Sequence, residues 1–254
     1  MYIYPSRDNK YDAVILHKKH HGHTLETLPP GSVIGTSSLR RVAQLARRYP
    51  HLKYENVRGN LNTRLRKLDE DNKYDALVLA VAGIHRMNWH ERISQILTPP
   101  SCLYAVGQGA LAVEVRNNDK ETLDVLSKLT HLQTLICCAA ERAYLHRLEG
   151  GCSAPVGISA EWQDNKLKLE GAVLSLDGGQ CITDEVCHTV EQNTSENDDM
   201  EYLSDISTTC VIIPEYLKHA LQCSENSGIE LANMLLNRGA GEVMKIAKEM
   251  IEKS

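Results

Sequence analysis

The chain has 254 residues, of which 42% are hydrophobic and 24% charged, and its formal net charge is −5 at pH 7. This composition is typical of a globular protein with one or two domains. The longest apolar run, Ala76 to Ile84, is far shorter than the roughly 18–20 residues that span a membrane, and the start of the chain does not resemble a signal peptide. We therefore expect a cytoplasmic protein that binds no membrane and, because it is acidic overall, no nucleic acid.

Strand and helix signals alternate along the first half of the chain. Strands are predicted at residues 11–16, 32–35, 53–57 and 75–80, and helices at residues 39–49 and 61–68. Proline at position 50 ends the first of these helices. Alternating strands and helices indicate a parallel α/β sheet whose ligand crevice lies at the carboxyl ends of the strands.

The second half of the chain changes character after a glycine turn at residues 107–109. A short strand at 110–115 and helices at 120–128 and 132–148 follow, and Gly150-Gly151 ends the second helix. Three strands at 159–162, 166–175 and 180–190 are separated by turn residues, which predicts an antiparallel meander. Helices at 228–236 and 242–252 close the chain, and the acidic segment 191–201 is expected to be a mobile loop.

The region from Thr36 to Lys67 is strongly basic, with nine lysines and arginines against one acid, Glu55. Two runs in this region each follow a predicted strand. Each run contains a polar residue that can cap a helix and arginines close to the start of that helix. Helix starts attract anions and disfavour positive side chains, so this placement indicates a bound anion. Each charge-assisted bond to a carboxylate would contribute about 1.5–3 kcal/mol. We assign Arg40, Arg41, Arg58 and Arg64 to this anion site, whereas Arg47 and Arg48 are interpreted as solvated surface charges.

The eight cysteines include no Cys-x-x-Cys pair, which argues against zinc ribbons and zinc fingers, and no metal site is expected. The histidines between positions 17 and 23 lie in a lysine-rich connection and are interpreted as a solvated loop. Cys152 differs from the other cysteines because it follows a long helix and two glycines, which let a backbone fit closely around a ligand. The residues alone leave three roles open for Cys152: a nucleophile, a redox thiol or an attachment point.

Five runs, in order over more than a hundred residues, resemble the porphobilinogen deaminases, also called hydroxymethylbilane synthases. The runs are Gly35–Arg41, Arg58–Arg64, Ala80–Arg86, Ala105–Ala110 and Glu149–Ser153. The resemblance implies an α/β fold: a periplasmic-binding-protein-like parallel-sheet domain, then a smaller α+β C-terminal domain with a three-stranded antiparallel sheet. The implied divisions are a linker or N-terminal remnant at 1–10, the α/β domain at 11–106, a returning segment of a mostly missing first domain at 107–130, and the C-terminal domain at 131–254.

The resemblance also implies a transferase of haem and tetrapyrrole biosynthesis. Such enzymes condense four porphobilinogen molecules, with loss of ammonia, into hydroxymethylbilane. They build the product on a dipyrromethane cofactor held by a thioether, here on Cys152. The implied partners are porphobilinogen and linear pyrrole intermediates, and the implied state is a monomer. A non-catalytic carboxylate-binding module derived from the same family is the alternative.

By the family pattern, Arg58 and Arg86 contact the substrate, and the remaining site residues bind the cofactor: Cys152, Thr36, Ser37, Ser38, Arg40, Arg41, Arg64, Ala82 and Gly83. The family's N-terminal domain, with its general acid/base aspartate, is not recognised in the sequence. Loss of a positioned acid/base typically costs about 10²–10⁴ in rate. We therefore expect this chain alone to be inactive and to fold poorly around residues 107–130. The polar loop at 191–201 suggests a eukaryotic-type member.

Overall fold

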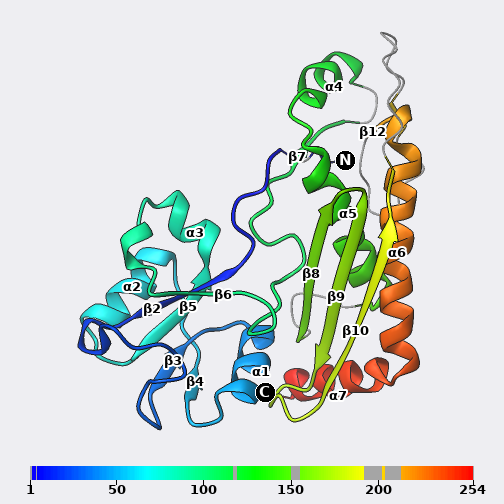
Figure 1. Cartoon of the computed structure of the whole chain (residues 1–254). Coiled ribbons are helices and arrows are strands. Elements are labelled where there is room, and N and C mark those ends of the chain that lie inside the picture. Colours follow the sequence, from blue (N-terminus) through cyan, green and yellow to red (C-terminus); the bar gives the residue numbers. More distant parts are fainter. Residues whose placement is uncertain are drawn as a thin grey trace.

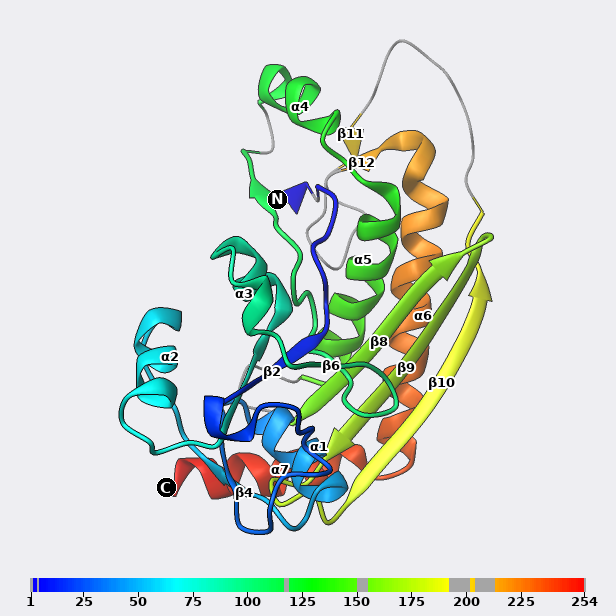
Figure 2. The ribbon, with the colours of Figure 1, turned by 60° about the vertical axis from the view of Figure 1, so that its left-hand side comes forward.

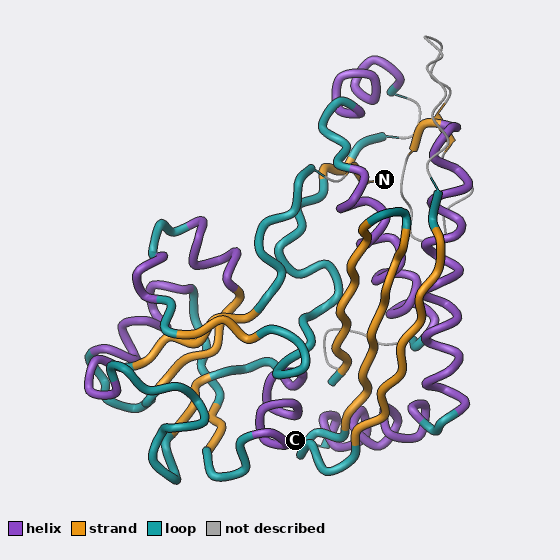
Figure 3. Tube along the Cα trace, viewed as in Figure 1, coloured by secondary structure: helices purple, strands orange, loops and turns teal. Residues whose placement is uncertain are grey.

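The computed structural model describes residues 2–3, 5–116, 119–149, 155–191, 202–203 and 213–253. These residues form two lobes, of which Figure 1 shows the first, in blue and cyan, on the left and the second, in green to red, on the right. The chain segments that link the lobes are mostly loop, as the colours of Figure 3 show.

The first lobe contains a five-stranded sheet in the order β4-β3-β5-β2-β6. Strand β3 runs parallel to β4 and β5, whereas β2 runs antiparallel to both β5 and β6. The strands are β2 (Asp12–Leu16), β3 (Val33–Gly35), β4 (Lys53–Glu55), β5 (Ala76–Ala80) and β6 (Gln95–Leu97).

Helices cover both faces of this sheet. The helices are α1 (Leu39–Arg48), α2 (Leu61–Asp69) and α3 (Val81–Arg86). Because side chains alternate between the faces of a strand, Val14 packs with Leu45 of α1 on one face, and Ile15 packs with Leu65 of α2 and Ile84 of α3 on the other. Burial on both faces explains why the strands read as continuous apolar runs.

The predicted α/β class is confirmed, but one strand differs from the expected parallel arrangement. Strand β5 lies between β3 and β2 in the sheet, and β3 runs parallel to β5 whereas β2 runs antiparallel to it. The segment between β2 and β3 contains only a short 3-10 turn (Lys18–His20). The chain therefore leaves β2 and enters β3 at the same edge of the sheet. Asp12, the first residue of β2, lies opposite Ala80, the last residue of β5.

The second lobe contains the predicted three-stranded antiparallel sheet, in the order β10-β9-β8. Figure 2 shows α5 and α6 side by side across one face of this sheet. A side chain at Gly228 of α6 would collide with the carbonyl of Ala140 in α5, so glycine permits the close approach of these helices. The elements are β8 (Val156–Gln163), β9 (Lys166–Leu174), β10 (Cys181–Thr189), α5 (Leu132–Arg147), α6 (Lys218–Asn237) and α7 (Ala240–Glu252).

Helix α6 begins at Lys218, well before the predicted start at Gly228. The first turns contain Ser224 and Ser227, which are buried although they are polar. Their hydroxyls donate to main-chain carbonyls one turn back, at 2.7 and 2.8 Å. These bonds satisfy the buried hydroxyl groups inside the helix. Because polar serines occupy buried positions, the apolar periodicity of this part of α6 is interrupted, and the helix start predicted from the sequence is too late.

Shorter elements complete the chain. Strand β1 (Tyr2–Ile3) pairs with β7 (Val113–Glu114), which is shorter than the strand predicted at 110–115, and α4 (Lys120–Ser127) follows. Strands β11 (Tyr202–Leu203) and β12 (Ile213–Pro214) form a second short pair. Apart from Glu191, the predicted loop at 191–201 lies outside the described residues. The domain boundaries, and poor folding at 107–130, stay predictions.

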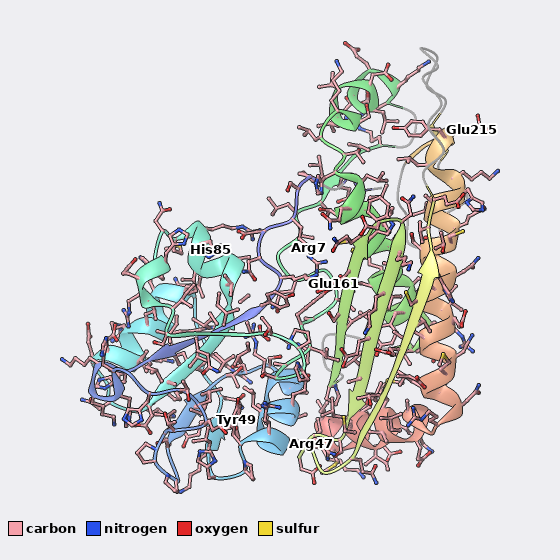
Figure 4. The ribbon with its side chains drawn as sticks, in the orientation of Figure 1. Arg7, Arg47, Tyr49, His85, Glu161 and Glu215 are labelled. Carbon is pink, nitrogen blue, oxygen red and sulfur yellow. The ribbon has the colours of Figure 1, made fainter. Side chains whose placement is uncertain are left out.

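The lobes meet at the carboxyl-terminal half of α1. Arg47, labelled in Figure 4, donates to the carbonyls of Gly178 and Gly179 at 3.2 Å each. Gly178 has a φ of 74°, and a side chain there would collide with the α1 backbone at Ala43. The turn between β9 and β10 therefore lies directly on α1, and Arg47, though exposed, is a contact between the lobes and not only a solvated charge.

Candidate functional site

Helices α1, α2 and α3 begin at one edge of the first-lobe sheet, where the parallel strands β3, β4 and β5 end. We call this the carboxyl edge; it comprises residues 36–41, 58–64 and 80–86. The hydroxyl of Ser38 caps α1 by accepting from the N–H of Arg41 at 3.4 Å, and the side chain of Asn60 caps α2 by accepting from the N–H of Thr63 at 2.9 Å. The other N–H groups at the starts of α1 and α2 attract anions.

Asp12 reaches the carboxyl edge because β2 runs antiparallel to β5. Its carboxylate is buried and accepts from Arg40 Nη1 at 2.8 Å and from Arg41 Nε at 2.9 Å. Burial alone would raise the pKa of Asp12, but the two guanidinium groups outweigh burial and lower the pKa to about 2. Asp12 is therefore ionised at neutral pH and offsets part of the positive charge of this edge.

The two arginines that bind Asp12 are held differently. The Arg40 side chain is 4% exposed and also donates to the carbonyl of Leu103, so it fastens α1 to the loop after β6. Its Nε is buried with no hydrogen-bond partner among the described residues. The Arg41 side chain is 11% exposed and donates to the carbonyl of Val78 at 3.0 Å. Of the two, Arg41 is the more accessible from the carboxyl edge.

Three further predicted cations lie at the surface of this edge. Arg64 Nε donates to the carbonyl of Gly59 at 2.8 Å, and Arg86 Nη2 donates to the carbonyl of Gly109 at 3.1 Å. Arg58 is exposed. Within the described part of the chain, none of Arg58, Arg64 and Arg86 forms an ion pair with an acidic side chain. Their charges therefore remain available to a ligand.

The other predicted cofactor residues lie at the same helix starts. Thr36 is buried, and its hydroxyl accepts from the N–H of Ser38 at 3.3 Å. Ser37 is exposed and donates its hydroxyl to the carbonyl of Val57 at 2.6 Å. Ala82 is buried and Gly83 half-buried, both in α3. The structure thus brings all these residues to one edge, and their roles stay predictions.

Two chain segments, residues 7–11 and 104–110, cross between the lobes along the carboxyl edge (Figures 1 and 2). Gly109 has a φ of 81°, and a side chain there would lie 2.9 Å from the carbonyl oxygens of Asp8 and Asn9. Only glycine permits this close approach of the two segments. Asp8 also forms a hydrogen bond of 3.0 Å with His85 of α3. The connection to the second lobe is therefore adjacent to the candidate site.

Arg7 joins the first crossing segment to the second lobe; Figure 4 shows it between the lobes. Its guanidinium pairs with Glu141 of α5 through bonds of 2.6 and 3.0 Å, and its Nε donates to the carbonyl of Gln108 at 2.9 Å. The two side chains of the pair are 8% and 0% exposed. Glu141 also accepts from the hydroxyl of Tyr104 and the N–H of Gly107.

Cys152, the predicted attachment point, lies outside the described residues, as do Gly150, Gly151 and Ser153. Helix α5 ends at Arg147. Glu149, the last residue described before Cys152, has a φ of 54°, which turns the chain away from the helix axis. The structure thus fixes the helix that leads to Cys152, and the role of the cysteine stays a prediction.

The histidine-rich connection is only partly solvated. His21 and His23 are exposed, as predicted. The prediction is wrong for His17, which is 3% exposed. The main-chain N–H of His17 donates to the carbonyl of Asp75, so His17 continues the pairing of β2 with the sheet and is not part of the loop. Among the described residues, no group of three or more histidines, cysteines, aspartates or glutamates is arranged to hold a metal ion. None of the described helices is long and apolar enough to cross a membrane.

Sequence analysis missed four residues of this region: Arg7, Asp12, Gln108 and Glu141. For Asp12 a signal was present, because an acid at the start of an apolar strand needs a buried partner. Gln108 lies inside one of the five quoted runs but was read as part of a turn. No signal in the neighbouring sequence predicts that Arg7 pairs with Glu141.

Comparison with known proteins identifies the family. Residues 1–124 match the family model described as porphobilinogen deaminase, dipyromethane cofactor binding domain, and residues 135–207 match the model described as porphobilinogen deaminase, C-terminal domain. The chain belongs to the porphobilinogen deaminase family. The first of these matches contains the whole carboxyl edge.

Individual relatives support the same assignment. A porphobilinogen deaminase of Prochlorococcus marinus (strain NATL1A) is 42% identical over 239 residues, which are 94% of this chain and 66% of that protein. The enzyme of Synechococcus elongatus is 51% identical over 71% of this chain and 56% of its own length. That of Schizosaccharomyces pombe is 49% identical over 68% of this chain and 54% of its own length. The chain thus spans less than two thirds of the length of the curated relatives it matches.

Proposed function

We propose that the chain supplies the cofactor and substrate sites of a porphobilinogen deaminase, a transferase that condenses four porphobilinogen molecules, with loss of ammonia, into hydroxymethylbilane. We expect the chain by itself to turn over far more slowly than a complete enzyme. The observation that supports this proposal most is the convergence of Arg41, Arg58, Arg64 and Arg86 on one edge that the cofactor-domain family model covers. Each pyrrole of such a chain carries an acetate and a propionate. A growing product therefore needs many cationic groups with few competing carboxylates.

The donors at the carboxyl edge fit a dipyrromethane cofactor. A guanidinium group is planar and always charged, and it binds a carboxylate through two parallel bonds. We propose that Arg41 and Arg64, with Ser37 and Ser38, hold the cofactor carboxylates. When bound through Cys152, the cofactor supplies the terminal pyrrole carbon from which the product grows.

The remaining predicted residues have separate proposed roles. Arg58 and Arg86 are exposed and bind the carboxylates of incoming porphobilinogen. Thr36, Ala82 and Gly83 shape the helix starts beside the cofactor. Arg40 contributes positive charge from a buried position, because its donors are directed at Asp12 and Leu103.

The two aspartates described at this edge are unsuited to proton exchange near neutral pH. Asp12 has a pKa of about 2. Burial is the largest single influence on the pKa of Asp8 and raises it, but hydrogen bonds from the Asn9 N–H and from His85, together with nearby positive charge, lower the pKa overall. We therefore propose that the general acid/base of the reaction is neither of them, and that the described residues alone support turnover about 10²–10⁴ below a complete site.

Intact mass spectrometry of the purified chain tests the proposed function. We expect an added mass equal to two linked pyrroles, present in the wild type and in Cys187→Ser, and absent from Cys152→Ser. Cys187 is the control because it is exposed and distant from Cys152 in sequence. Added mass that persists in Cys152→Ser contradicts the assigned attachment point. A wild type without added mass, even after incubation with porphobilinogen, favours the non-catalytic carboxylate-binding module, although the names of the relatives favour the enzyme. We further expect a cytoplasmic monomer, which gel filtration and cell fractionation test.

A further inference from the structure

Gln108 lies on the second crossing segment and places its side-chain amide against Asp12 and both arginines. Its Nε2 donates to Asp12 Oδ1 at 2.9 Å and to the carbonyl of Lys10 at 2.8 Å. Its Oε1 accepts from Arg40 Nη2 at 3.3 Å and, more weakly, from Arg41 Nη2 at 3.5 Å. Both ends of the amide are therefore used at the carboxyl edge.

Arg41 is anchored through all three of its side-chain nitrogens. Its Nε and Nη2 contact Asp12 Oδ1 at 2.9 and 2.7 Å, and its Nη1 donates to the carbonyl of Val78. A guanidinium group is a rigid plane with five N–H donors, so three anchors fix the directions of the donors that remain. Asp12 supplies two of these anchors, and Gln108 holds Asp12 by donating to the same oxygen.

We propose that Asp12 and Gln108 are positioning residues, which fix the orientation in which Arg41 offers its free donors to a ligand carboxylate. The proposal rests on the proposed function of the carboxyl edge as a carboxylate site. Neither residue needs to touch the ligand, since both act through Arg41. Asp12 sets the direction of the guanidinium plane, and Gln108 prevents Asp12 from rotating away.

Gln108 also connects the site around Arg41 to the second lobe. The main-chain carbonyl of Gln108 accepts from Arg7 Nε, and Arg7 pairs with Glu141 of α5. The N–H of Gly107, the preceding residue, donates to Glu141 at 2.7 Å. Helix α5 leads to Cys152, so two adjacent residues, Gly107 and Gln108, hold the carboxylate site in register with the helix before the proposed attachment point.

Gln44 of α1 offers a matched control. Its Oε1 accepts from the N–H of Leu103 at 2.7 Å, and its Nε2 donates to the carbonyl of Leu103 at 2.9 Å. Gln44 thus fastens α1 to the segment after β6 with bonds as short as those of Gln108, but none of its bonds involves a guanidinium group. A purely structural role predicts similar effects for Gln108→Leu and Gln44→Leu. Asp12→Asn is not suitable, because it removes the counter-charge of both buried Arg40 and half-buried Arg41 and unfolds the site.

The first experiment uses labelling by phenylglyoxal, which modifies accessible arginines, and peptide mass mapping of the labelled positions. We expect the labelling rate of Arg41 to rise several-fold in Gln108→Leu and to stay at the wild-type value in Gln44→Leu. Exposed Arg58 is the internal reference for reagent activity and should not change. An Arg41 rate that is equal in the two variants overturns the proposal, and thermal unfolding of both variants shows that each is folded.

The second experiment measures porphobilinogen binding by calorimetry in chains that carry Cys152→Ser and therefore hold no attached cofactor. Porphobilinogen has the same acetate and propionate as a cofactor pyrrole, so it serves there as the probe of the carboxylate site that Arg41 lines. We expect about tenfold weaker binding when Gln108→Leu is added, as for the loss of one well-placed charge-assisted bond, and unchanged binding when Gln44→Leu is added. Unchanged affinity on adding Gln108→Leu contradicts the positioning role. Failure of the Cys152→Ser chain itself to bind porphobilinogen contradicts the proposed function, and the labelling experiment then still decides whether Gln108 orients Arg41.

Discussion

The buried ion pair between Arg7 and Glu141 predicts a large effect for the substitution Glu141→Gln. In the native chain, Glu141 Oε1 accepts from Arg7 Nη1 at 2.6 Å and from the Tyr104 hydroxyl at 3.1 Å. Its Oε2 accepts from Arg7 Nη2 at 3.0 Å and from the N–H of Gly107 at 2.7 Å. Glutamine has the same shape, but it replaces one of these oxygens with an NH₂ group.

Whichever way the new amide turns, one of the two Arg7 bonds and one further bond lose their acceptor, and the charge of Arg7 stays buried without a counter-charge. Breaking a buried ion pair from one side typically costs about 3–5 kcal/mol. We expect a loss of that size in the free energy of unfolding. It is a large share of the roughly 5–15 kcal/mol that stabilises an ordinary domain.

Urea unfolding followed by circular dichroism measures this loss. The matched control is Glu185→Gln, because Glu185 pairs with Lys168 at 2.9 Å while the two side chains are 63% and 56% exposed. An exposed pair contributes less than about 1 kcal/mol. If the two glutamine variants differ by less than about 1 kcal/mol, the reasoning is refuted. A double variant with Arg7→Met should lose less stability than the sum of the single variants, because no buried charge is then left alone.

Three further predictions concern acid stability, a turn glycine and the cysteines. The pKa of Asp12 is about 2 in the folded chain and about 3.9 in an unfolded one. Asp12 therefore contributes about 2–3 kcal/mol to the free energy of unfolding, which is fully present above pH about 4 and is lost as the pH falls toward 2. A free energy of unfolding that stays constant over this pH range contradicts the prediction. Gly178→Ala should destabilise the chain by about 1–3 kcal/mol, because the new methyl group collides with the α1 backbone at a positive φ. Thermal unfolding measures this loss, with Gly179→Ala as the control, since the atoms nearest to Gly179 belong to a side chain. Equal losses in the two variants argue against the prediction. Exposed Cys187 should react with iodoacetamide in the folded chain, whereas Cys102, buried and with its pKa raised to about 12 by burial, should react only after unfolding; rapid labelling of native Cys102, detected by peptide mapping, speaks against the assignment.

The carboxyl edge was predictable where its signals are local. The cap residues Ser38 and Asn60 and the arginines that follow them stand within a few positions of each other, and helix starts are encoded at that range. The parallel direction of β3 and β5 then follows from the helices between them. These local signals were sufficient to predict that Arg41, Arg58 and Arg64 lie at one edge.

The partners of the arginines were not predictable because they depend on chain direction and on distant contacts. Asp12 contacts Arg41 only because β2 runs antiparallel to β5. The sequence of a strand does not indicate in which direction the strand runs within the sheet. Arg7 and Glu141 are separated by 134 positions. Their pairing depends on how the two lobes dock, which no local pattern encodes.

Helix α1 has ten residues and is about 15 Å long at 1.5 Å per residue. Its first turn carries Arg40 and Arg41, and its last turn lies against the turn between β9 and β10. A displacement at one end of so short and rigid a rod is transmitted to the other end. Substitutions in residues 175–180 should therefore weaken ligand binding without touching a ligand, and a mutational scan would record a second sensitive region at the opposite end of α1.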